Sequence, residues 1–141
     1  METTEAKTMD MAAKQDGQVL LKDLHFEHRL WLNELKFYKE ELGIFEHRLD
    51  DLVKRNTVKK ALARLEQFQN KFIHQKEVIH DLKHRIKAHE KQLAVFAEGY
   101  PIAVDHHHFT DHVSLRDEMA DYREIFSEMK ESFMRYLAEW M

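Results

Sequence analysis

The sequence predicts an all-α fold, an antiparallel three-helix bundle of long helices with coiled-coil character. One proline and three glycines in 141 residues leave few places for turns. Charged residues make up 34% of the chain and hydrophobic residues 43%, which is typical of long amphipathic helices. From Leu21 onward, apolar residues recur with the seven-residue period of a coiled-coil seam. We expect one domain over residues 18–141, preceded by a disordered N-terminal tail over residues 1–17.

The first helix is expected over residues 18–54. Its seam has a single polar member, His28. The seam positions are Leu21, Leu24, His28, Trp31, Leu35, Tyr38, Leu42, Phe45, Leu49 and Leu52.

The second helix is expected over residues 57–98. Asn56 or Thr57 can cap its start. Gly99 suits a left-handed cap after its last turn, and Pro101 cannot continue a helix interior. Its seam, in which Gln75 and His89 are polar, is Val58, Ala61, Leu65, Phe68, Phe72, Gln75, Ile79, Leu82, Ile86, His89, Leu93 and Phe96.

The third helix is expected over residues 105–141, with Asp105 or Thr110 as its cap. Its apolar run extends backward, at the same spacing, onto His112 and His108. The apolar seam positions are Leu115, Met119, Tyr122, Phe126, Met129, Phe133, Tyr136 and Trp140.

The connection between the first two helices is short, which forces them into an antiparallel hairpin. This alignment places Tyr38 opposite Gln75, and we interpret the pair as a polar layer that fixes the register. The third helix is expected to be too short to cover the hairpin. Residues 45–64 should therefore form a two-helix tip whose incompletely covered side chains are Phe45, Leu49, Leu52, Val53 and Leu62.

The segment "HHHFTDH", residues 106–112, raises the question of a metal site. Histidines at or beside seam positions are the better candidates, because a bundle places its ligands inside. Imidazole suits zinc, copper or nickel, and His108 and His112 have the one-turn spacing that lets two rings reach one ion. The candidate ligands are His25, His28, His89, His108 and His112.

The expected register of the third helix places His28 and His112 two layers apart, so these candidates should not all share one metal. The alternative is that the seam histidines are buried polar residues satisfied by hydrogen bonds, or that they tilt toward solvent. Other tempting pairs, His47 with Asp51 and His80 with His84, fall on outward positions and are not expected to bind metal.

A second apolar row, Leu30, Phe37 and Ile44, recurs every seven residues away from the seam. A periodic exposed row suggests a contact with another chain. Together with Phe45 and Leu52 of the expected tip, it forms the predicted interface. We expect a homodimer, because two-fold assemblies dominate, or a complex with an unidentified protein partner.

Composition narrows the class of function. The formal net charge is -4, but residues 54–91 carry eleven Lys or Arg against four Asp or Glu. We interpret this basic segment as complementary to acidic neighbouring helices, and nucleic acid is not the favoured partner. The polar start lacks a secretion signal, no run is apolar enough for a membrane span, and there is no cysteine, so we expect a cytoplasmic protein.

No glycine-rich phosphate loop or nucleophile motif is present, and a narrow bundle offers no obvious pocket. We therefore expect a non-enzymatic protein that acts in protein interaction or scaffolding. The alternative is a protein for transition-metal storage or sensing that uses the histidine cluster.

Overall fold

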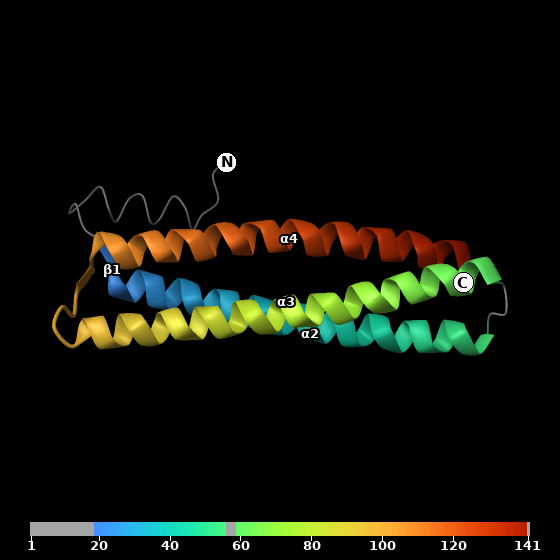
Figure 1. The fold of residues 1–141 in the computed structure, drawn as a ribbon, viewed down its shortest axis with the longest axis horizontal. Helices are drawn as coiled ribbons and strands as arrows, with labels where there is room; N and C mark the ends of the chain where they lie inside the picture. Colours follow the sequence, from blue (N-terminus) through green and yellow to red (C-terminus); the bar gives the residue numbers. More distant parts are fainter. Residues whose placement is uncertain (1–18, 56–58, 141) are drawn as a thin grey trace. The chain divides into compact units, whose positions relative to one another are not determined.

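The computed structural model describes residues 19–55 and 59–140, most of which lie in three long helices (Figure 1). Helix α2 spans Leu21–Arg55, α3 spans Lys59–Ala97 and α4 spans His106–Trp140. Strands β1 (Val19–Leu20) and β2 (Ala103–Val104) pair antiparallel. The prediction of an all-α three-helix bundle is confirmed, with helix bounds within a few residues of those expected. The expected tail and the caps Asn56 and Thr57 lie outside the described residues.

Contacts within the chain divide it into two compact units, and each contains a stretch of all three helices. The first unit comprises the chain up to Asn33 together with Lys83–Met119. The second comprises Glu34–Leu82 together with Ala120–Met141. That residues 18–141 form a single domain stays a prediction.

The predicted seam is the core in both units, because the seven-residue repeat places its members on the inward side of each helix. Nearly every described seam position is buried. Four positions are only half-buried: Tyr38, Phe96, His108 and Trp140.

The prediction of a two-helix tip is wrong. The Phe45 ring packs 5.7 Å from that of Phe72 on α3 and 5.1 Å from that of Phe133 on α4. Phe45 and Leu52 are 4% and 2% exposed, so neither is available to another chain. Leu49 is buried as well.

The reason is that α4 covers the hairpin further than expected. The Tyr136 hydroxyl donates a 2.8 Å hydrogen bond to the carbonyl oxygen of Ala61, at the beginning of α3. Val53 and Leu62 do remain partly exposed, at 44% and 36%.

Among the described residues, no hydrogen bond joins Tyr38 to Gln75 in the predicted polar layer. The Tyr38 hydroxyl donates instead to Glu34 Oε2 at 2.7 Å, one helical turn back. Gln75 Oε1 is buried and lacks a hydrogen-bond partner among the described residues.

Helices α2 and α4 are joined by ion pairs that repeat every seven residues. In the first unit Glu27 pairs with Arg116, and in the second Glu34 pairs with Arg123 and Glu41 with Lys130. The partners are always 89 residues apart. A constant offset means that α2 and α4 run in the same direction within the second unit, where two such pairs occur.

The link from α3 to α4 positions the start of α4. After α3 ends at Ala97, Leu21 N donates to Ile102 O at 2.9 Å, and β2 then pairs with β1. Asp105 Oδ1 accepts from the backbone N–H of His108 at 3.0 Å, which confirms Asp105 as the cap of α4. The described helices contain no stretch long and apolar enough to cross a membrane.

Candidate metal centre

Three histidines, one from each helix, meet in the core of the first unit. They are His28 of α2, His89 of α3 and His112 of α4, and we call them the histidine triad. One ring nitrogen of each lies within 4.8 Å of one ring nitrogen of each of the others. The three residues are 1%, 4% and 0% exposed. Three imidazoles thus converge in a site closed to bulk water.

The expectation that His28 and His112 lie two layers apart is wrong. Their ring centroids are 4.9 Å apart, and the His89 ring lies 5.1 Å from that of His28 and 5.6 Å from that of His112. Shifting a helix by whole heptads leaves every apolar residue in the seam, so periodicity alone could not fix the register of α4.

An acceptor holds the outward nitrogen of each ring. Nδ1 of His28 donates to Glu90 Oε1 at 2.7 Å, and Nε2 of His112 donates to Glu27 Oε1 at 2.7 Å. Nε2 of His89 donates to the carbonyl oxygen of His108 at 3.1 Å. Carboxylates and carbonyls in these positions fix the tautomer and orientation of metal-binding histidines.

With the outward nitrogens occupied, the remaining nitrogen of each ring is the one left to act as a ligand. His28 Nε2 and His89 Nδ1 are 3.1 Å apart, while His112 Nδ1 is buried without a hydrogen-bond partner among the described residues. In tetrahedral zinc sites, Zn–N bonds of about 2.0–2.1 Å place ligand nitrogens roughly 3.3 Å apart. One edge of the triad is close to that spacing, and an ion would give His112 Nδ1 a partner.

Burial keeps the triad in the neutral form that binds metal. Desolvation lowers the pKa of His28, His89 and His112 below the ordinary histidine value, although Glu90 and Glu27 oppose this for His28 and His112. Burial would raise the pKa of Glu27, but the hydrogen bonds from His112 and Arg116 outweigh it and hold that pKa below its usual value. The core therefore presents neutral imidazoles backed by ionised carboxylates.

Trp31 covers one side of the triad. Its ring stacks on His112 at 4.8 Å and 24°, and lies 5.6 Å from the His28 ring. The indole thus forms an apolar wall against His28 and His112.

Two of the five predicted ligands lie outside the triad. His25 is exposed and contacts Glu90 through Nδ1. His108 Nδ1 lies 2.6 Å from Asp105 Oδ1, and only the backbone carbonyl of His108 reaches the triad. From "HHHFTDH", His112 alone belongs to the triad. His47, His80 and His84 are exposed, as expected.

Sequence reasoning missed Glu27 and Glu90. Each is the direct neighbour of a seam histidine, in the sequences Glu27–His28 and His89–Glu90. An acid beside a seam position flanks the core, where it can accept from a histidine on another helix. That adjacency could have identified both carboxylates.

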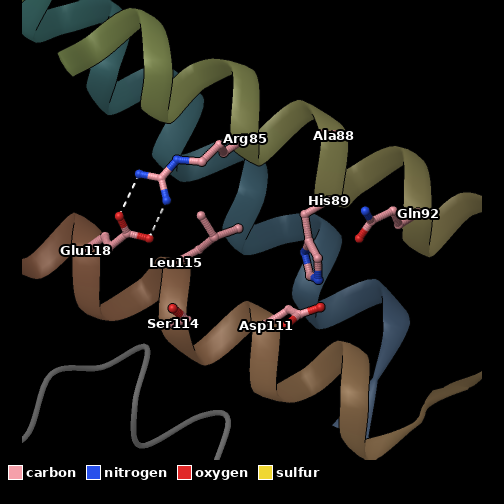
Figure 2. Close-up of a pocket in the computed structure, with 8 residues that line it drawn as sticks. All are labelled: Arg85, Ala88, His89, Gln92, Asp111, Ser114, Leu115 and Glu118. Atoms are coloured by element: carbon pink, nitrogen blue, oxygen red, sulfur yellow. Dashed lines mark hydrogen bonds and ion pairs between the residues drawn. The ribbon is translucent and has the colours of Figure 1, made fainter.

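A surface hollow of about 270 Å³ borders His89 (Figure 2). Figure 2 shows the His89 ring between α3 and α4, with Asp111 of α4 beside it. Arg85 and Glu118 form a two-bond ion pair at the other end, with both N–O distances 2.6 Å.

Comparisons with known proteins give no relatives: no protein-family model, curated protein or solved structure matches this chain.

Proposed function

We propose that this protein is a non-enzymatic transition-metal-binding protein that holds one divalent ion on His28, His89 and His112. The observation that carries the proposal is the orientation of the three rings. Each ring gives one nitrogen to an outer acceptor; of the other nitrogens, His28 Nε2 and His89 Nδ1 lie 3.1 Å apart, and His112 Nδ1 has no hydrogen-bond partner among the described residues. A core histidine with a purely structural role would not leave a nitrogen such as His112 Nδ1 unpartnered.

The ligand set favours zinc, copper(II) or nickel(II). Neutral imidazole suits these ions, whereas calcium and magnesium prefer oxygen ligands. Three protein ligands leave a further coordination position for water or another small ligand. Because a single triad takes a single ion, sensing or structural use of the metal fits this arrangement better than bulk storage. We take the hollow beside His89 as the route by which the ion enters.

The test is a titration of tag-free, chelator-stripped protein with Zn²⁺ against a chromophoric competitor. The wild type should bind one equivalent tightly, and His112→Ala should lose at least about tenfold in affinity. His84→Ala is the matched control, because His84 is exposed and is not one of the three proposed ligands. This variant should bind zinc as the wild type does. Equal binding by both variants, or no binding by the wild type, would overturn the proposal.

A second candidate function is association with another chain through α2. In the second unit, Phe37 and Ile44 are 56% and 67% exposed, and their seven-residue spacing suits pairing with a second helix. We propose a second copy of this chain as the occupant. Light scattering coupled to gel filtration should give a dimer mass for the wild type and a monomer mass for Phe37→Lys. A monomeric wild type at micromolar concentration would remove this candidate.

A further inference from the structure

A second hollow, of about 470 Å³, lies in the second unit between the beginning of α3 and the end of α4. Its volume is in the range of small-molecule sites. It takes no part in the histidine triad, whose residues all belong to the first unit.

The hollow is positively charged. Lys60 and Arg64 of α3 and Arg135 of α4 line it, against the single acid Glu139. The chain as a whole has a net charge of -4, so this local excess of cations runs against the overall charge. Such a concave cluster raises the local concentration of anions.

Arg135 and Arg64 each contact a residue one turn away on their own helix. Arg135 forms an ion pair with Glu131 at 3.1 Å, but both side chains are about 70% exposed. An exposed pair of this kind is weak and exchanges readily for a better partner. The Arg64 guanidinium lies 5.4 Å from the centroid of the Phe68 ring, a cation–π distance.

Aromatic side chains supply the other part of the wall. Tyr136 is 3% exposed and its hydroxyl is bound to Ala61, so this ring is a fixed surface. Trp140, half-buried, lines the same hollow. Trp140 offers apolar contact beside the cations, and the guanidinium groups match phosphate oxygens in geometry.

We propose that this hollow binds a small phosphate monoester with a planar aromatic part, of the nucleoside monophosphate class. Arg64, Arg135 and Lys60 bind the phosphate, and the ring system lies against Trp140. The ligand adds a second function that does not depend on the metal.

The experiment is an NMR titration of ¹⁵N-labelled full-length protein with AMP, adenosine and inorganic phosphate, in the presence of EDTA. AMP should shift the amide signals of residues around Arg64 and Arg135 and the indole signal of Trp140. Adenosine should bind at least about tenfold more weakly, because it lacks charge-assisted hydrogen bonds. Equal affinity for AMP and inorganic phosphate would overturn the aromatic part of the proposal.

Two variants distinguish AMP binding in this hollow from a general effect of surface charge. Arg64→Gln should weaken AMP binding at least about tenfold, as expected for loss of a charged hydrogen-bond donor. Lys71→Gln is the matched control, because Lys71 also lies over Phe68, at 5.2 Å, but does not line the hollow. Equal effects of the two substitutions, or no binding of AMP at millimolar concentration, would refute the proposal.

Discussion

Replacing Glu27 with glutamine tests whether this buried carboxylate supports the triad. Glu27 accepts hydrogen bonds from His112 Nε2 at 2.7 Å, from Arg116 Nη2 at 2.9 Å and from Arg116 Nε at 3.0 Å. A glutamine oxygen in the place of Oε1 could still accept from His112 and from Arg116 Nη2, but the amide nitrogen in the place of Oε2 would face the Arg116 Nε donor, and the negative charge would be lost. Hydrogen bonds to charged groups contribute about 1.5–3 kcal/mol each, so the metal-free protein should lose roughly 2 kcal/mol of unfolding free energy. Loss of the outer partner of a ligand should also weaken zinc binding about 10–100-fold.

The α2–α4 ion pairs provide a matched control, Glu41→Gln. Glu41 has the same heptad position as Glu27, but it pairs with Lys130, which is 42% exposed, and not with a triad histidine. A pair of this exposure contributes about 0–1 kcal/mol. Urea denaturation in EDTA measures the stability change, and competition with a zinc chelator measures the affinity change. If the two variants behaved alike in both assays, Glu27 would be an ordinary ion-pair partner.

Three more predictions concern the histidine triad. Burial lowers the pKa of all three histidines in the folded protein. Below a pH of about 6.5, the ordinary pKa of histidine, the unfolded chain therefore binds more protons at these residues than the folded protein does. Their contribution to stability is complete above that pH and is lost as the pH falls through the lowered pKa values. The urea midpoint in EDTA should therefore be lower at pH 5.5 than at pH 7.5, and equal midpoints would contradict the burial. Zinc at 100 times its Kd should stabilise the fold by about 2.7 kcal/mol, which is roughly 5–10 °C in Tm for a chain of this size; scanning calorimetry should show no such rise in His112→Ala. Since Trp31 stacks on His112, Cu²⁺ should quench tryptophan fluorescence in the wild type. Trp31→Phe, which retains Trp140, should lose most of that quenching, and strong quenching in this variant would place the copper elsewhere.

The seven-residue repeat predicted the helices and their buried faces, because burial of one helix face depends mainly on local spacing. It also identified His28, His89 and His112 as inward-facing. It could not show that these three meet, since the register of α4 depends on its connection to α3. The pairing of β1 with β2 and the cap at Asp105 position that connection, and both involve contacts with no periodic signal.

The sequence also did not predict which carboxylates hold the histidines. Glu27, Glu34 and Glu41 recur every seven residues, so the repeat predicts the same degree of burial for all three. In the structure only Glu27 is fully buried, because it alone has a core histidine as well as an arginine to satisfy its oxygens. Which acid of a row is buried depends on the residues opposite, and therefore on the register.

The most direct test of the metal site is X-ray absorption at the zinc edge on tag-free protein loaded with one equivalent of Zn²⁺. Coordination by His28, His89 and His112 predicts three imidazole nitrogens at about 2.0–2.1 Å and one further light ligand. A spectrum dominated by oxygen ligands, or containing a single imidazole, would show that zinc binds at the surface and would contradict the triad as the metal site.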